Sequence, residues 1–305
     1  KRNEVTKEIR EAKFNFEYKL AENIKEDPKS FYAYVRSKSK CRSEIGSLKW
    51  KDNMIEDDEG KAIVLNDYFA SVFTKEDTST IPAIVNVEGG NTLSDINITE
   101  ERIQKAVDKI KHNKAAGEDG LVSTFVKGSI RGVMKPLLNI FRRSLEETVI
   151  TDEWKIANVT ATFKKGVKWD PANYRPVSLT SQIGKIMERI IKDDMVNFVE
   201  SKNLIKNSQH GFRNKKSCLT NLLVFMEKVA ELLNSREPVD VIYLDFQKAF
   251  DKVPHKRLIV RLEEIGIKGK LLSWIKEWLN GRKQRVVING KASQWKEVDS
   301  GVPQG

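Results

Sequence analysis

Four apolar or aromatic residues in succession, Val241 to Leu244, lead directly into the carboxylate of Asp245. A continuous apolar run of this length is typical of a buried strand, so the sequence predicts a buried strand over residues 239–245. A strand of this kind holds an acid rigidly at its C-terminal end, where a metal ion can bind. The alternative is that Asp245 only caps the helix that follows it.

Helical spacing of apolar residues accounts for most of the remaining chain. It predicts helices over residues 4–26, 30–38, 63–73, 121–148 with an interruption near Pro136, 181–202, 217–233, 257–265 and 269–280. Thr99 is the predicted N-cap of a further helix. Residues 155–163 alternate like a strand, a small hairpin is expected within 46–58, and Asn289-Gly290 predicts a hairpin turn. This order of elements favours an α+β domain over a regular βαβ repeat.

A stretch rich in threonine, serine, glycine and asparagine, residues 75–97, is the predicted linker. The length of the chain allows two domains, at about 150 residues each. We therefore expect a mainly helical segment over residues 1–98 and a second domain over residues 99–305. Because the first residue is Lys1 and the last lies within a motif, we expect an internal piece of a longer protein.

The charge of the chain favours a polyanionic partner, with nucleic acid first and an anionic membrane second. The net charge is +11, and residues 161–216 hold twelve Lys or Arg against five Asp or Glu. The alternative is an ordinary solvated basic face. Cys41 and Cys218 are the two cysteines, which predicts neither a disulfide framework nor a zinc site and fits an intracellular compartment. No stretch approaches the ~20 apolar residues of a membrane span, so we expect no membrane partner.

One basic segment is a candidate for binding phosphate. Lys164, Lys165 and Arg175 surround a loop within residues 163–181. Lysine offers a mobile point charge, while arginine offers a planar fork that can hold two phosphate oxygens, so together they suit a triphosphate. The alternative is an ordinary basic turn.

A second basic segment, residues 208–217, places Phe212 beside Arg213. An aromatic ring next to cations fits stacking on unpaired bases with contacts to the backbone. The alternative is that Phe212 packs into the core. Residues 300–305, SGVPQG, contain glycine and proline that could fix a turn close to a nucleic acid.

Six segments in this order resemble the reverse transcriptases of LINE-type (non-LTR) retrotransposons, the jockey-like ones in particular. They are AAGEDG (115–120), FKKG (163–166), NYRPVSLTSQIGKIMERII (173–191), QHGFR (209–213), YLDFQKAFDKVPH (243–255) and SGVPQG (300–305). The resemblance is strong over about residues 100–305, and YLDFQKAFDKVPH is its most specific motif. Residues 1–99 resemble, more weakly, the segment that precedes the polymerase in these elements.

This resemblance implies a right-hand polymerase with fingers and a partial palm, and an RNA-directed DNA polymerase activity. It implies that Asp245, with the backbone carbonyl of Phe246, binds Mg²⁺, for which Mn²⁺ could substitute, in a two-metal phosphoryl transfer. The implied substrates and partners are dNTPs, a DNA primer and an RNA template, with the element's own RNA expected among them. The implied location is the nucleus and the cytoplasm.

The resemblance also assigns roles in substrate binding. Lys164 or its neighbour Lys165, together with Arg175, would hold the triphosphate of the incoming nucleotide. Phe250 resembles the gate that packs on the nucleotide sugar and rejects a 2′ hydroxyl. The remaining implied contacts are those of Phe212 and Arg213 with the template or the nascent pair, and of Pro303, Gln304 and Gly305 with the template and nucleotide pocket.

The chain departs from the family pattern in three ways. Proline usually stands where Ala161 or Thr162 stands, and also where Glu118 stands. The Asp-Asp pair that completes the metal site in the family does not occur after SGVPQG within the 305 residues. We therefore expect these residues alone to lack polymerase activity. The alternative function is a non-catalytic nucleic-acid-binding module from a decayed or domesticated element.

Overall fold

The computed structural model describes residues 2–38, 45–81, 92–112 and 114–303. Its internal contacts divide the chain into two units, Lys1–Gly46 and Ser47–Gly305. Each unit is described by itself. The predicted domain boundary between residues 98 and 99 stays a prediction.

The first unit is a pair of helices. Its elements are α1 (Arg2–Glu22), the short 3₁₀ helix η1 (Asn23–Lys25) and α2 (Pro28–Lys38). The rings of Phe16 and Tyr34 meet edge to face, with centroids 5.5 Å apart, and the Tyr34 hydroxyl donates to the Glu17 carboxylate. Helices are confirmed in both regions predicted from the spacing of apolar residues, and Pro28 begins the second, where its fixed φ is favourable.

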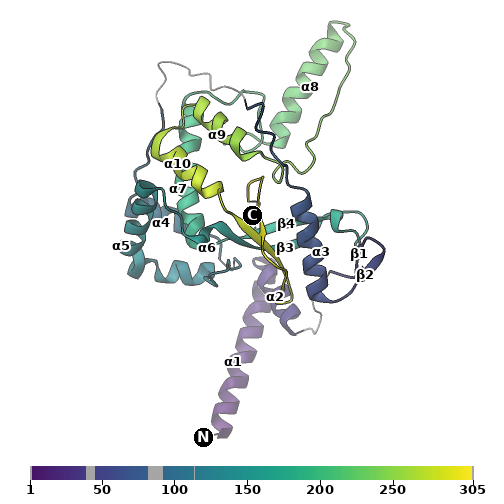
Figure 1. The fold of residues 1–305 in the computed structure, drawn as a ribbon. Helices are drawn as coiled ribbons and strands as arrows, with labels where there is room; N and C mark the ends of the chain where they lie inside the picture. Colours follow the sequence, from purple (N-terminus) through teal and green to yellow (C-terminus); the bar gives the residue numbers. More distant parts are fainter. Residues whose placement is uncertain (1, 39–44, 82–91, 113, 304–305) are drawn as a thin grey trace. The chain divides into compact units, whose positions relative to one another are not determined.

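The second unit is built on a mixed sheet of five strands. They are β3 (Ile156–Phe163), β4 (Tyr174–Leu179), β5 (Lys283–Ile288), β6 (Lys291–Ala292) and β7 (Lys296–Glu297). The order is β4-β3-β5-β6, and β7 also pairs with β5; β3 and β5 are parallel, and the other pairs are antiparallel (Figure 1). Asn289 and Gly290 turn the β5–β6 hairpin with φ of 49° and 81°, the left-handed values that a tight hairpin turn requires.

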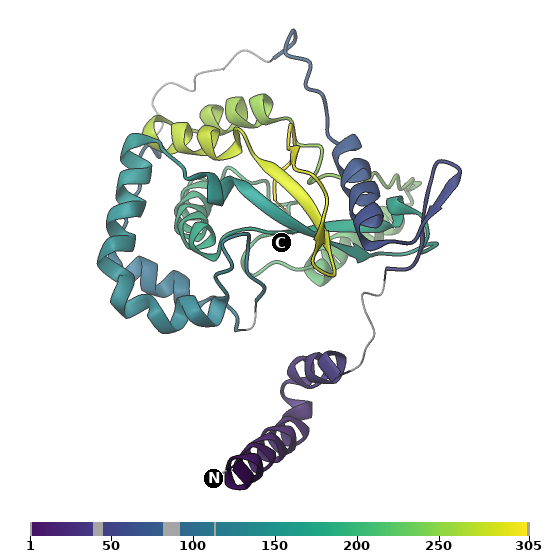
Figure 2. The same cartoon turned by 60° about the horizontal axis from the view of Figure 1, so that its bottom comes forward.

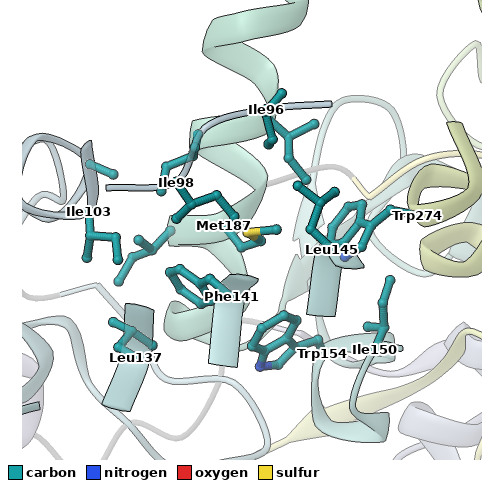
Figure 3. Close-up of a cluster of buried hydrophobic side chains, with 14 of the residues drawn as sticks. Ile96, Ile98, Ile103, Leu137, Phe141, Leu145, Ile150, Trp154, Met187 and Trp274 are labelled. Carbon is teal, nitrogen blue, oxygen red and sulfur yellow. The ribbon is translucent and has the colours of Figure 1, made fainter. Parts of the chain in front are cut away.

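Helices form a buried core beside this sheet. The elements are α4 (Glu100–Asp108), α5 (Ser123–Glu147), α6 (Asp152–Lys155), α7 (Gln182–Ser201), α9 (His255–Glu264) and α10 (Gly269–Leu279). Phe141 and Met187 are fully buried, and Figure 3 shows them in one cluster with Trp154 and Trp274. The Trp274 indole N–H donates to the Ser144 hydroxyl over 3.0 Å, so these two buried polar groups are paired.

A further helix, α3 (Asp58–Ser71), packs against the sheet (Figure 2). In the sequence it precedes the predicted linker. The Gln284 side-chain amide of β5 donates to the side-chain oxygen Oδ1 of Asn66 over 3.3 Å, and Lys296 pairs with Asp67 at 2.7 Å. Before α3, the predicted small hairpin is confirmed as β1 (Leu48–Trp50) and β2 (Asn53–Ile55). Residues before 99 therefore pack on the same sheet as residues after it.

Most elements confirm the predictions, and the mixture of helices and sheets is consistent with the α+β class. Thr99 caps α4 by accepting from the Arg102 N–H at 3.3 Å. The predicted interruption near Pro136 is wrong, because α5 runs through it. Pro136 is exposed, and the residue four positions earlier is Gly132, so the missing hydrogen bond falls on the solvent side of the helix.

Strand β4 was not among the elements predicted. Its residues, YRPVSL, include Pro176, which pairs in register with Ala161 of β3. Proline cannot donate a hydrogen bond and is therefore rare in inner strands, but it is tolerated in an outer strand such as β4.

The predicted buried strand over residues 239–245 is wrong. The segment forms no strand, and Ile242, Tyr243 and Leu244 are 82%, 84% and 92% exposed. The helix before it, α8 (Cys218–Asn234), is confirmed, but none of its residues is buried; Figure 1 shows it beside this extended segment. A strand needs a neighbour for its N–H and C=O groups, and no described strand pairs with this run. The apolar composition alone therefore misled the prediction.

Candidate functional site

The β3–β4 hairpin presents the first set of predicted site residues. Arg175 pairs in register with Thr162, and the Lys164 N–H donates to the Asn173 carbonyl at 2.8 Å, which closes the hairpin loop. Gly166 has a φ of +88°, and a Cβ there would lie 2.8 Å from the Asn173 side chain, so the loop requires glycine at this position.

The cationic side chains of this hairpin face solvent. Lys164, Lys165 and Arg175 are exposed, and none of the three forms an ion pair with another residue in the described ranges. They are therefore open to an anionic ligand, as the predicted contact with a triphosphate requires.

Asp245 lies in the exposed extended segment before the turn at residues 247–252. The alternative that it caps the next helix is wrong, because α9 begins at His255 and its N-cap is Pro254. The Phe246 side chain is 87% exposed. Asp245 therefore neither ends a buried strand nor caps a helix. Its role as a metal ligand stays a prediction.

The motif after Asp245 is joined to the SGVPQG motif by backbone hydrogen bonds. The Gly301 N–H donates to the Val253 carbonyl at 2.8 Å, and the Val302 N–H donates to the Phe250 carbonyl at 2.9 Å. The ring of His255 also bonds to the Gly301 carbonyl, at 2.7 Å between Nε2 and the oxygen. Two segments some fifty residues apart in the sequence are therefore held side by side.

Only glycine fits at the centre of this contact. Gly301 has a φ of +85°, and a Cβ there would lie 2.6 Å from the Phe250 carbonyl oxygen and 2.8 Å from the Asp251 Cα. Pro303 follows and is partly buried, whereas Gln304 and Gly305 lie outside the described residues. Pro303 directly follows Val302, whose N–H binds the Phe250 carbonyl, and the roles of Phe250 and Pro303 stay predictions.

Phe212 is 95% exposed, with a φ of +60°. The alternative that it packs into the core is therefore wrong. Its ring meets that of Phe250 edge to face, with centroids 6.3 Å apart. The guanidinium of the neighbouring Arg213 donates to the Lys206 carbonyl at 3.3 Å. The QHGFR motif therefore touches the motif that follows Asp245.

Lys248 and Tyr68 also belong to this region, and neither was a predicted site residue. Lys248 has its Nζ 5.3 Å from the ring centroid of Tyr68 in α3. Burial lowers the pKa of Lys248, Asp251 acts in the opposite direction, and the charges of Lys164 and Arg175 lower it further. The hairpin cations and the turn after Asp245 therefore lie within electrostatic reach of one another.

The carboxylate that faces this lysine is Asp251. Burial raises the pKa of Asp251, and the Lys248 ammonium opposes that rise. Asp251 also holds the SGVPQG motif through its backbone, because its carbonyl accepts from the Ser300 hydroxyl at 2.7 Å. The sequence places Asp251 six residues after Asp245, within the motif YLDFQKAFDKVPH. Its contact with Ser300 was not predictable from the sequence, because that residue lies in a distant segment.

The departure at Glu118 has a structural explanation. The Glu118 carboxylate accepts from the Arg285 guanidinium of β5 at 2.6 Å and from the Asn158 amide of β3 at 2.7 Å. The Arg285 guanidinium also stacks on the Trp295 ring, 4.4 Å from its centroid. Glu118 therefore connects the AAGEDG segment to two strands. A proline at position 118 could not make these contacts, because it has no carboxylate.

The residues that the structure describes do not fit a pair of divalent cations. Among them, no three His, Cys, Asp or Glu side chains lie close enough together to hold a metal ion. Asp245 and the carbonyl of Phe246 could supply only part of a Mg²⁺ site, which ordinarily adds water and substrate phosphates to one or two carboxylates. Separately, no helix in the described ranges is long and apolar enough to cross a membrane.

The chain is similar to several known proteins. Residues 163–305 match the model of the reverse transcriptase (RNA-dependent DNA polymerase) family. The chain is similar to the RNA-directed DNA polymerase from mobile element jockey of Drosophila funebris, at 30% identity over 209 residues, which cover 68% of this chain and 23% of that protein. It is also similar to the probable RNA-directed DNA polymerase from transposon X-element of Drosophila melanogaster, at 26% identity over 204 residues, 67% of this chain and 22% of that protein.

A longer alignment reaches toward the N-terminus. The putative 115 kDa protein in type-1 retrotransposable element R1DM of Drosophila melanogaster is 26% identical over 284 residues, 90% of this chain and 25% of that protein. The chain thus spans a quarter or less of the length of these relatives. The predicted resemblance is confirmed: the chain is related to the RNA-directed DNA polymerases of LINE-type elements, and its residues 163–305 carry the reverse transcriptase family pattern.

Proposed function

We propose that this chain is part of an RNA-directed DNA polymerase, which adds dNTPs to a DNA 3′ end on an RNA template. The β3–β4 hairpin would belong to the fingers, and the motifs around Phe250 and Gly301 to part of the palm. The observation that carries the proposal is the contact of three motifs at Phe250, whose ring meets that of Phe212 and whose carbonyl accepts from the Val302 N–H at 2.9 Å. It supports a single site formed by motifs from three separate parts of the sequence.

In this proposal, Lys164 and Arg175 hold the triphosphate of the incoming nucleotide. Phe250 lies against its sugar, and Phe212, which touches Phe250, lies against the nascent base pair or the template. Catalysis in this family depends on divalent metal in general. Because the described residues do not fit two ions, no step of the transfer is assigned to Asp245. The element's own RNA as template, and a nuclear and cytoplasmic location, stay predictions.

Nucleotide binding tests the proposal directly. dTTP is titrated into the chain of residues 1–305, and binding is followed by the intrinsic tryptophan fluorescence. Lys164→Gln combined with Arg175→Gln should weaken binding by at least about tenfold, because each charge-assisted contact contributes ~1.5 kcal/mol or more. Lys270→Gln combined with Arg131→Gln removes the same charge at exposed positions elsewhere and should change little. Equal binding by both double variants would contradict the proposal.

A primer-extension assay addresses catalysis by these residues alone. With poly(rA), oligo(dT), dTTP and Mg²⁺, we expect no extension, because the described residues provide one carboxylate at position 245 and no cluster to complete the site. Robust synthesis by residues 1–305 would contradict the expectation that these residues lack polymerase activity.

The exposed Asp245 favours one alternative, a nucleic-acid-binding module without catalysis. In that case, RNA binding should weaken with rising salt and should survive Asp245→Ala. It should be lost when Lys164, Arg175 and Arg213 are replaced together. Binding of RNA without any binding of dTTP would favour this alternative over the polymerase.

A further inference from the structure

Two exposed aromatic rings border the loop of the β3–β4 hairpin. Trp169 is 46% exposed and Phe163 is 37% exposed, and residues 164–168 between them are all exposed. The Trp169 indole N–H makes no hydrogen bond to a residue in the described ranges. A tryptophan that is neither buried nor hydrogen-bonded leaves a large apolar ring and a donor open to a partner.

The backbone that carries the Trp169 ring is held in place by two other segments. The Trp169 carbonyl accepts from the Lys49 N–H of β1 at 2.7 Å, and the Lys168 carbonyl accepts from the Tyr174 hydroxyl at 2.6 Å. Figure 1 shows the β1–β2 hairpin beside this end of the β3–β4 hairpin. Because the loop backbone is fixed before any ligand arrives, little conformational entropy is lost there on binding.

A lysine side chain lies over each ring. The Nζ of Lys49 is 5.8 Å from the Trp169 ring centroid, and the Nζ of Lys168 is 5.8 Å from the Phe163 ring centroid. Both distances are close to the outer limit of about 6 Å for a cation–π contact, so a ligand can replace these contacts at little cost. Within the part of the chain that the structure describes, neither lysine forms an ion pair.

Exposed rings among unpaired lysines suit single-stranded nucleic acid. An unpaired base stacks on an aromatic ring, while cations beside the ring contact the phosphates of the same strand. Residues 163–170 hold three lysines against one acid, Asp170, so the loop favours an anionic strand. A protein partner fits less well, because lysine is depleted at protein interfaces.

We propose that Trp169, with Lys49 of β1 and Lys168, binds an unpaired segment of nucleic acid by stacking on a base and contacting the neighbouring phosphates. The inference goes beyond the proposed function, because it requires neither the nucleotide site nor catalysis. It also gives β1, which lies before residue 99, a part in binding. The structural alternative is that Lys49 and Trp169 pack on one another and only stabilise the hairpin loop.

Fluorescence anisotropy of labelled oligo(U) RNA, titrated with the chain of residues 1–305, tests the stacking contact. Trp169→Leu keeps an apolar side chain without an aromatic face and should weaken binding at least about fivefold, the lower end for the loss of one stacked base. Trp169→Phe retains a face for stacking and should keep most of the affinity. Trp295→Leu is the matched control, because Trp295 is also partly exposed, at 36%, and also has a cation, Arg285, over its ring.

The salt dependence of the same binding tests Lys49. Lys49→Gln should weaken binding and reduce the slope of log affinity against log salt by about one, as expected for the loss of one phosphate contact. Lys270→Gln removes an exposed charge elsewhere and should leave the slope unchanged. Thermal unfolding of every variant verifies that it is folded. Labelled oligo(dT) in place of oligo(U) shows whether the strand bound is RNA alone or either nucleic acid, because stacking itself tolerates both.

Three results would overturn the inference. They are the absence of oligo(U) binding by the wild type, equal affinities of Trp169→Leu and Trp295→Leu, and equal weakening by Trp169→Leu and Trp169→Phe. An RNA duplex offers no unpaired base, so Trp169→Leu should bind it like the wild type; an equal loss on the duplex would also count against stacking. Binding of dTTP should be unchanged in Trp169→Leu, so the double variant of Lys164 and Arg175 tests the proposed function separately.

Discussion

Glu76 provides the cap that helix α9 lacks. The N-cap position of α9 is Pro254, which makes no side-chain cap. The Glu76 carboxylate instead accepts from the backbone N–H groups of Lys256 and Arg257, at 2.9 and 3.0 Å, and from the Arg257 guanidinium at 3.3 Å. It thus fastens the start of the predicted linker to a helix 180 residues later in the chain.

The contribution of Glu76 to stability can be worked out from these contacts. Loss of a side-chain cap costs about 1 kcal/mol, within a range of 0.5–2. The ion pair adds ~0.5 kcal/mol after allowance for solvent screening, since the Arg257 side chain is 34% exposed while that of Glu76 is 11% exposed. We therefore expect Glu76→Ala to lower the free energy of unfolding by about 1.5 kcal/mol at neutral pH.

The effect should depend on pH in a defined direction. Burial raises the pKa of Glu76, but the N–H groups of Lys256 and Arg257 and the Arg257 guanidinium outweigh it, so the pKa lies below its ordinary value of 4.5. A carboxylate with a lowered pKa stabilises the fold above the unfolded-state value, and this stabilisation is lost as the pH falls through the folded-state value. The difference between Glu76→Ala and the wild type should therefore shrink in acid.

Urea unfolding followed by circular dichroism at pH 7 and at pH 3 measures the loss in free energy of unfolding and its dependence on pH. Glu146→Ala is the control, because Glu146 is an exposed acid on α5; it should change stability by less than about 0.5 kcal/mol. Glu76→Gln should fall between the wild type and Glu76→Ala, because an amide oxygen can still accept one hydrogen bond. A loss below about 0.5 kcal/mol, or an equal loss at both pH values, would refute the capping role.

Three further substitutions follow from the packing. Leu222→Ser on α8 should leave the free energy of unfolding within about 0.5 kcal/mol of the wild type, because Leu222 is 59% exposed; a larger loss in urea unfolding would show that α8 is packed in solution. Leu271→Ala should cost about 2–5 kcal/mol in the same assay, since Leu271 is fully buried, and a cost below 1 kcal/mol would contradict the core. Gly301→Ala should weaken dTTP binding and lower the melting temperature, because the added Cβ would meet the Phe250 carbonyl at 2.6 Å; unchanged behaviour in both assays would count against the contact between the two motifs.

Local signals made part of the fold predictable. The hairpin at Asn289 and Gly290 and the cap at Thr99 depend on nearby residues only, and both are confirmed. The run before Asp245 has the composition of a buried strand, but burial depends on a partner strand that local composition does not specify. β4 was missed for the opposite reason, because Pro176 is unusual in strands except at an edge.

The same distinction applies to the candidate site. Motif order found the hairpin cations, Phe212 and Phe250, and the structure brings the two rings into contact. Lys248 and Tyr68 could not be found in this way, because they are 180 residues apart and their contact exists only once α3 lies on the sheet. Spacing in the sequence carries no information about such a pair.

The proline in β4 has a consequence for how this sheet meets other chains. β4 is the outermost strand on its side, and at Pro176 it has no N–H to offer to an approaching strand. An exposed strand edge is a template on which foreign segments can pair and aggregates can grow, and one absent donor interrupts that template. A single residue of the β3–β4 hairpin therefore protects this border of the sheet against unwanted extension.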